Sequence, residues 1–147
     1  MKIIVDADAC PVTRIAEDVA KKYNIPCTLV CDTSHQLDSD YSVVFTVSKG
    51  ADSADYKIVN LIDKGDVVVT QDYGLAAMCI SRGARAVNQN GMIYNDSNID
   101  SLLFFRAASA KARRAGVRMK GPKKRDNSQN ENFKSAFCKL IESNSVD

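Results

Sequence analysis

Short runs of apolar residues alternate along the chain with amphipathic segments of helical period. The apolar runs predict buried strands over residues 2–5, 27–31, 43–47, 67–70 and 84–88. Helices are predicted between them over residues 11–23, 50–65, 72–82 and 97–114, the last because Ser97 and Asp100 have the spacing of a capping box. Strands that alternate with helices favour a parallel sheet wrapped by helices, so the sequence predicts the α/β class.

The C-terminal third follows a different pattern. Residues 116–130 are polar and basic without periodicity, which predicts a loop, and apolar residues at helical spacing then predict a short amphipathic helix. With 147 residues the chain has the length of one domain. We therefore expect an α/β domain over residues 1–115, a basic loop over 116–130, and a C-terminal helix over 131–147 that packs on the same domain.

The charges are distributed unevenly along the chain. Residues 1–105 contain 9 Lys and Arg against 14 Asp and Glu, whereas residues 106–147 contain 11 against 4. A basic end suggests a polyanionic partner. No segment has the roughly 20 apolar residues of a membrane helix, and the five cysteines include no Cys-x-x-Cys, so we expect a cytoplasmic protein without a membrane, disulfide or zinc role.

Acidic residues follow the predicted strands. Asp6 and Asp8 follow the first strand, Asp52 and Asp55 begin the helix after the third, and Asp72 follows the fourth. If these strands are neighbours, their carboxylates meet at the edge where parallel sheets bind ligands. Carboxylates gathered in a small volume need a compensating cation, and oxygen ligands without nearby His or Cys favour Mg²⁺ or Mn²⁺.

Such a metal site would suit phosphodiester hydrolysis. Two ions about 4 Å apart can activate a water and stabilise the leaving oxygen. Each acid also has a simpler interpretation, because Asp is a common helix cap. Asp52 with Asp55 fits a capping arrangement, Asp72 fits an N-cap, and Asp8 fits an exposed loop residue.

Basic residues that could contact a nucleic-acid backbone lie mainly after residue 112. Lys49 precedes Gly50 and the acid pair, where it could reach a phosphate. The basic end would give salt-sensitive binding to RNA or DNA, and its alternative is a solvated loop. The candidate nucleic-acid-binding residues are Lys49, Arg113, Arg114, Arg118, Lys120, Lys123, Lys124 and Arg125.

Four segments together resemble the YaiI/YqxD family of bacterial proteins, which is assigned to the PIN-like superfamily. They are MKIIVDADACPV, GADSADYKIV, VVVTQDYGLAAMCISRGA and GMIYNDSNID, and the resemblance covers nearly the whole chain. It implies a PIN-like three-layer α/β/α sandwich with an acidic edge. PIN-like nucleases place an Asp after the first strand, an acid on a middle helix and an Asp after the fourth strand.

By that resemblance Asp6 matches the first acid, Asp52 or Asp55 the second, and Asp72 the third. The fourth acid of the PIN pattern has no counterpart here apart from Asp96. The segment from Lys49 to Asp52 also resembles the K-G-x-D of the NYN branch of the superfamily. The resemblance thus implies a Mg²⁺- or Mn²⁺-dependent nuclease, and we expect RNA, or else DNA, as the nucleic acid.

Two other functions stay open at this point. The opening segment also has the form of the first motif of haloacid-dehalogenase-like phosphatases, with Asp6 as nucleophile and Asp8 as general acid, although the later motifs are out of order. A non-catalytic metal- and nucleic-acid-binding regulator is the other alternative. We also keep a homodimer among the expected partners.

Overall fold

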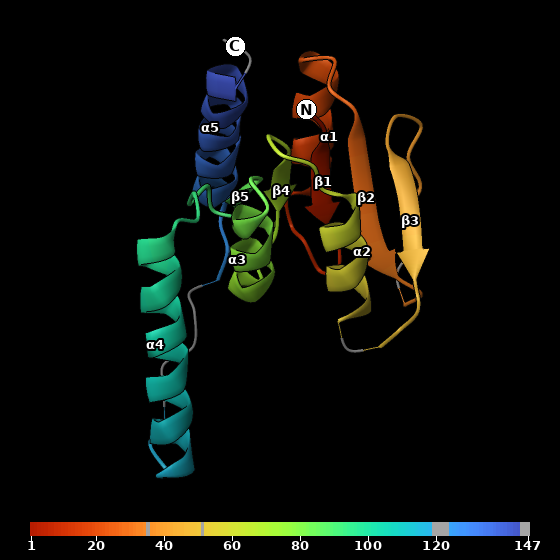
Figure 1. The fold of residues 1–147 in the computed structure, drawn as a ribbon. Coiled ribbons are helices and arrows are strands. Elements are labelled where there is room, and N and C mark those ends of the chain that lie inside the picture. The colour runs from red at the N-terminus through yellow and green to blue at the C-terminus, as the bar shows by residue number, and fades with distance from the viewer. Residues whose placement is uncertain (35, 51, 119–123, 145–147) are drawn as a thin grey trace.

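The computed structural model describes residues 1–34, 36–50, 52–118 and 124–144 of the chain. In these residues five strands form one sheet in the order β3-β2-β1-β4-β5, and every neighbouring pair is parallel (Figure 1). The strands are β1 (Ile3–Asp6), β2 (Cys27–Asp32), β3 (Val43–Val47), β4 (Val67–Val69) and β5 (Arg85–Val87). The predicted parallel α/β sheet is confirmed.

Helices cover both faces of the sheet, which gives three layers. The helices are α1 (Thr13–Lys22), α2 (Ser53–Leu61), α3 (Tyr73–Ser81), α4 (Asp96–Arg114) and α5 (Asn127–Asn144). Helices α1 and α5 share one apolar cluster with the sheet, and α2 and α3 share another. Helix α4 packs against α3 and projects beyond the carboxyl edge of the sheet (Figure 1). None of the helices in the described residues has the length and apolar character of a membrane span.

The alternation of side chains along β1 decides where the acids point. Ile3 and Val5 lie in the cluster with α1 and α5, whereas Ile4 lies in the cluster with α2 and α3. Because successive strand residues point to opposite faces, Asp6 is directed toward the α2/α3 face like Ile4. Strand β4 runs beside β1 with Val69 opposite Val5, so Thr70 comes next to Asp6.

The chain reverses its direction of travel across the sheet between β1 and β4. Strands β2 and β3 lie on one side of β1, and β4 and β5 lie on the other. The chain leaves β1 toward α1 on one face and leaves β4 toward α3 on the opposite face. Open parallel sheets bind ligands in the crevice that such a divergence leaves at the carboxyl ends of the strands.

The helix starts differ by one to four residues from the sequence prediction, and the starts of α1, α4 and α5 are instructive. The predicted capping box of Ser97 and Asp100 is wrong, because Asn95 caps α4 and exchanges two hydrogen bonds of 2.8 Å with Asn98. Helix α1 begins at Thr13 rather than at residue 11. Helix α5 begins at Asn127, inside the segment expected to be a loop.

The early start of α5 has a local cause. The backbone N–H of Asp126 donates to Gln129 Oε1 at 2.9 Å, and Asp126 Oδ1 accepts from the N–H of Ser128 at 2.9 Å. Asp and Gln at this spacing form a helix-start signal that the basic composition of the segment obscures. Phe133 and Phe137 of α5 are fully buried in the same apolar cluster as Ile3 and Val5.

Candidate functional site

Thr70 fixes the centre of the acidic edge. Its hydroxyl donates a hydrogen bond of 2.8 Å to Asp6 Oδ2 and accepts one of 3.0 Å from the backbone N–H of Asp72. The Tyr94 hydroxyl donates to the carbonyl of Thr70 at 3.1 Å, and Thr70 itself is buried. This residue was not among the sequence candidates. The sequence feature that could have identified Thr70 is a hydroxyl residue between the end of a buried strand and an aspartate.

The surroundings of Asp6 make its charge costly. Burial, together with the nearby carboxylates of Asp55, Asp8 and Asp72, raises the pKa of Asp6 to about 6, although the Thr70 hydrogen bond acts in the opposite direction. These groups come from three segments of the chain, the end of β1, the start of α2 and the end of β4. Asp6 therefore lies in the shared negative field of three other predicted site residues.

Asp72 has a structural role that the sequence also allowed. It is the N-cap of α3, and its Oδ1 accepts hydrogen bonds from the N–H groups of Gly74 at 2.9 Å and Leu75 at 3.2 Å. The capping interpretation of Asp72 is therefore confirmed. The cap engages Oδ1 and keeps the carboxylate at the first turn of α3, beside Thr70.

Asp55 and Asp52 bring the start of α2 to the same edge. Burial raises the pKa of the half-buried Asp55, and the charges of Asp72 and Asp52 raise it further. Asp52 is exposed and occupies the N-cap position with a left-handed backbone, φ 67°, but its side chain makes no capping hydrogen bond. The capping interpretation of Asp52 is wrong. A non-glycine residue in this conformation is strained, as is common beside functional sites.

Asp8 follows β1 in the sequence, but its side chain is hydrogen-bonded to the end of β2. Its Oδ1 accepts a hydrogen bond of 3.0 Å from the backbone N–H of Asp32, the last residue of β2. Asp32 in turn accepts from the N–H of Ser34 at 2.8 Å. Asp32 was missed from sequence although it follows an apolar run just as Asp6 does. The alternative that Asp8 is an exposed loop residue is wrong, because Asp8 is partly buried and accepts this hydrogen bond.

The donor set is chemically suited to a hard cation, but it does not form a closed cage. All the side chains at this edge offer oxygen atoms, which Mg²⁺ and Mn²⁺ prefer. Within the described part of the chain, no group of three or more His, Cys, Asp or Glu side chains is arranged to hold a metal ion. An ion bound here would draw the carboxylates closer than they lie in this structure.

The predicted nucleic-acid-binding residues are dispersed. Lys49 is exposed after β3, Lys124 is exposed before α5, and Lys120 and Lys123 lie outside the described residues, as does His35. Arg113, Arg114 and Arg118 are exposed at the far end of α4. Asp96, the remaining PIN-like candidate, is exposed in the first turn of α4.

Arg125, one of the predicted nucleic-acid-binding residues, is held in place by hydrogen bonds. Its guanidinium donates to Asn130 Oδ1 at 2.9 Å, to Asn90 Oδ1 at 2.6 Å and to the carbonyl of Gln89 at 2.7 Å. It lines a polar hollow of about 240 Å³ together with Gln71, which lies between Thr70 and Asp72. Arg125 thus borders the acidic edge.

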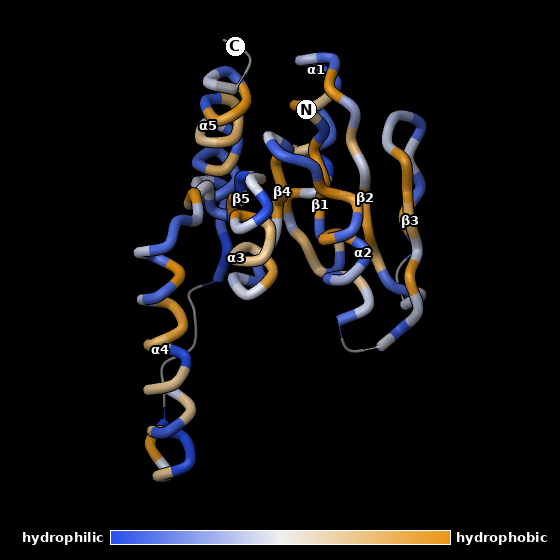
Figure 2. Tube along the Cα trace, in the orientation of Figure 1, coloured by the Kyte–Doolittle hydropathy of each residue, from blue (hydrophilic) through white to orange (hydrophobic). Residues whose placement is uncertain are grey.

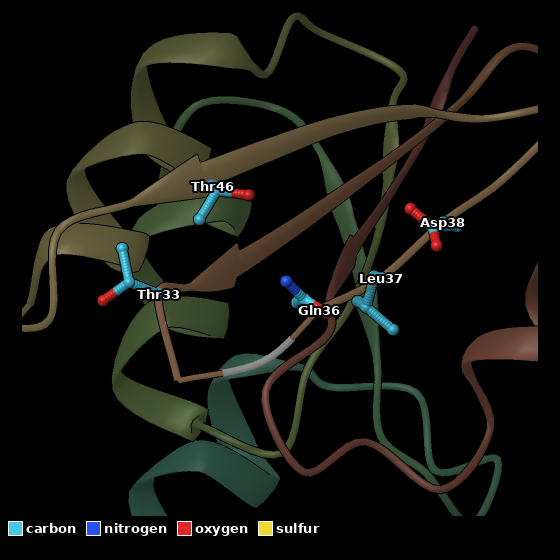
Figure 3. Close-up of a pocket in the computed structure, with 5 residues that line it drawn as sticks. All are labelled: Thr33, Gln36, Leu37, Asp38 and Thr46. Carbon is cyan, nitrogen blue, oxygen red and sulfur yellow. The ribbon is translucent and has the colours of Figure 1, made fainter.

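A larger hollow lies beside the carboxyl end of β2. It has a volume of about 440 Å³ and is lined by residues from the end of β2, the following loop and β3 (Figure 3). These residues are Thr33, Gln36, Leu37, Asp38 and Thr46. None of the predicted site residues lines this hollow.

Relatives of the chain show its family. Residues 4–143 match the family described as "Uncharacterized BCR, YaiI/YqxD family". The chain belongs to the YaiI/YqxD family. It is 52% identical over 143 residues to a UPF0178 protein of Clostridium acetobutylicum, covering 96% of this chain and 97% of that protein. It is also 52% identical over 141 residues to a UPF0178 protein of Ruminiclostridium cellulolyticum, covering 96% and 92%.

The YaiI/YqxD match extends beyond the clostridia. A UPF0178 protein of Exiguobacterium sibiricum is 43% identical over 141 residues, covering 96% of each chain. No solved structure matches the chain. The resemblance to the family is confirmed, and because the family description and these relatives' names state no reaction, the chemistry has to be inferred from the acidic edge itself.

Proposed function

We propose that this protein is a Mg²⁺- or Mn²⁺-dependent nuclease whose centre is formed by Asp6, Asp55 and Asp72. The observation that carries the proposal is the position of Asp6, at the crevice between β1 and β4, with a pKa raised to about 6 by burial and by three neighbouring carboxylates. Ionising these groups together costs free energy that a divalent cation offsets. The resemblance to PIN-like nucleases supports the same three positions.

Each carboxylate would have its own part. Asp6 and Asp55 would supply oxygen ligands from β1 and α2, and Asp72 would supply one from the start of α3 while Oδ1 keeps the helix capped. Asp8 and Asp52 would add negative charge from the flanks. When bound, Mg²⁺ or Mn²⁺ would supply a water of lowered pKa and stabilise the charge that develops on the leaving oxygen.

Thr70 would act as a positioning residue. Its hydroxyl donates a hydrogen bond to Asp6 Oδ2. This bond fixes the orientation of the whole carboxylate and therefore also the position of Oδ1. Since the hydroxyl also accepts from the N–H of Asp72, it sets the spacing between two of the three carboxylates. A site of this kind depends on such support because catalytic geometry tolerates little displacement.

The nucleic-acid chain would approach from the side of Arg125. Its guanidinium is already fixed by three hydrogen bonds, so it could contact a phosphate without first being ordered. Lys49 and the basic end of α4 would add phosphate contacts that weaken with salt. RNA is the first substrate to test, and DNA is its competitor.

The test is cleavage of end-labelled single-stranded RNA and DNA with Mg²⁺ or Mn²⁺. We expect the wild type to cleave, Asp6→Asn and Asp72→Asn to lose cleavage, and Asp18→Asn, which removes an exposed acid on α1, to retain it. Cleavage that persists undiminished in Asp6→Asn would overturn the proposal. Release of phosphate from small phosphomonoesters would instead indicate the phosphatase alternative.

One observation favours a second function. The described carboxylates form no group of three arranged to hold a metal ion, so they provide no preformed two-metal centre for hydrolysis, and this favours a protein that binds a metal ion and nucleic acid without cleaving. Under this alternative, RNA is retained in filter binding by the wild type and by Asp6→Asn, with no cleavage by either. Metal binding by titration calorimetry would then depend on Asp6 while RNA binding depends on Arg125.

A further inference from the structure

Helix α4 exposes large apolar side chains. Leu103, Phe104 and Phe105 are 45%, 77% and 63% exposed, respectively. They lie in the middle of the 19-residue helix, and Figure 2 shows apolar residues along the part of α4 that projects from the body. Adjacent exposed apolar side chains of this size are characteristic of contact surfaces.

One face of α4, its inner face, packs against the rest of the same chain. Ile99 and Ser109 are buried, and the guanidinium of Arg106 lies over the ring of Tyr73 at 5.9 Å. The helical period places Phe104 on the opposite side. We define the outer face of α4 by its exposed residues, which are Ser97, Asp100, Ser101, Phe104, Ala107, Ala108 and Lys111.

The outer face is complementary to itself. Asp100 lies toward its N-terminal end and Lys111 toward its C-terminal end, with Phe104 and the small side chains of Ala107 and Ala108 between them. If a copy of this face is turned end to end, acid meets base and the phenyl ring meets alanine. Neither a polyanion nor an unrelated apolar surface would match both charges.

We propose that the outer face of α4 binds the same face of a second copy of this chain, as an antiparallel helix pair about a two-fold axis between residues 105 and 106. This alignment places Phe104 against Ala107 of the second copy. It also places Asp100 against Lys111 of the second copy. Two-fold symmetry forms every contact twice, and antiparallel helices oppose their dipoles favourably.

The axis lies level with the acidic edge. Arg106 sits next to the axis and contacts Tyr73, which follows Asp72 and begins α3. In the dimer, the two paired α4 helices would therefore lie between the α3 helices of the two copies, each with its first turn next to the axis. This inference goes beyond the proposed nuclease function and does not depend on it.

Charge reversal in sedimentation equilibrium tests the pairing, with full-length protein and no added nucleic acid. The wild type is expected as a dimer of the 16.1 kDa chain. Asp100→Lys and Lys111→Asp should each weaken dimerisation at least tenfold, because each leaves like charges opposed at two symmetric positions. The double variant with both substitutions should restore it. Lys134→Asp, an exposed reversal on α5, should leave the dimer unchanged.

A second variant makes the outcome independent of the charges. Phe104→Asp is exposed, so it should fold, as circular dichroism will report, and yet remain monomeric. The proposal is overturned if the wild type is monomeric up to its solubility limit, if the double charge reversal fails to restore pairing, or if Phe104→Asp still dimerises. A monomeric wild type that loses RNA binding in Phe104→Asp would identify nucleic acid as the occupant instead.

Discussion

Thr70 and Asp6 are joined by a hydrogen bond of 2.8 Å although 64 residues separate them in sequence. The bond links the carboxyl ends of β4 and β1, the two strands between which the connections diverge to opposite faces. Because the same hydroxyl also accepts from the N–H of Asp72, a single side chain connects two candidate site residues. The order of the acidic edge therefore depends on a residue that carries no charge.

Replacing Thr70 by valine removes this connection at nearly constant volume. We expect Thr70→Val to raise the pKa of Asp6 above its value of about 6, because the hydrogen bond that favours the ionised form is lost. The free energy of unfolding should fall by about 1–3 kcal/mol, since the N–H of Asp72 also loses its partner. Carboxyl NMR titration and urea unfolding measure the two effects.

Thr70→Ser is the matched control for that experiment. It keeps the hydroxyl, so the pKa of Asp6 should stay near that of the wild type. A serine variant that shifts the pKa as much as valine does would contradict the role assigned to the hydrogen bond.

The stability of the metal-free protein should depend on pH through Asp6. Its pKa is 3.8 in an unfolded chain and about 6 in the fold, so the folded state retains the proton longer. The stabilisation is complete below about pH 3.8 and is lost as the pH rises through 6. Asp6→Asn, which remains neutral, should therefore gain stability relative to the wild type between pH 5 and pH 8.

The size of that gain follows from the shift. It is about 1–2 kcal/mol after allowance for solvent screening. Urea unfolding in the presence of a chelator measures it at the two pH values. Mg²⁺ should reverse the order at pH 8 by stabilising the wild type alone, and an Asp6→Asn variant that is less stable than the wild type at pH 8 with chelator present would refute the expectation.

Two substitutions of Asp72 separate capping from metal binding. Asp72→Ala removes the acceptor for Gly74 and Leu75 and should lower the free energy of unfolding by about 0.5–2 kcal/mol. Asp72→Asn keeps a side-chain acceptor and should cost much less. Both should abolish metal-dependent cleavage, so equal stability loss with retained cleavage in Asp72→Asn would assign Asp72 to the helix alone.

Gly91 tests the contact between the turn before α4 and helix α5. Its φ is +89°, and a Cβ there would lie 2.7 Å from the carbonyl oxygen of Asn132. Gly91→Ala should therefore destabilise the fold by about 2–4 kcal/mol, because backbone must shift. Gly65 has the same φ of +89° with nothing within 4 Å, so Gly65→Ala should cost only about 1 kcal/mol. Thermal unfolding compares the two.

The apolar periodicity is sufficient to predict the parallel α/β sheet, because fully buried strands such as Val67–Val69 have few other interpretations. It also predicts that Asp6 and Asp72 lie at strand ends. It does not predict which strands are neighbours, since the 64-residue separation between Thr70 and Asp6 leaves no local signal. The meeting of these residues depends on strand order, which is decided by tertiary packing.

Local polar chemistry accounts for most of the differences. Asn95 and Asn98 cap α4 by exchanging hydrogen bonds between their backbone N–H groups and side-chain oxygens. Ser97 and Asp100 have a similar spacing in the sequence, which explains the wrong prediction. The sequence does not identify Asp32 and Thr70 as site residues, because each resembles an ordinary polar residue at the end of a strand. Their hydrogen bonds to Asp8 and Asp6 are visible only in the structure. The left-handed backbone of Asp52 likewise has no signature in the residue type.

The position of β1 in the middle of the sheet has a consequence for biosynthesis. Strand β1 is translated first, but its second edge is paired only after β4 has been made. The apolar side chains on its α1/α5 face are covered only after Phe133 and Phe137 have been made. Nascent chains halted before α5 would thus expose the centre of the sheet and become clients of chaperones. Translation of α5 supplies the side chains that cover this face of the sheet.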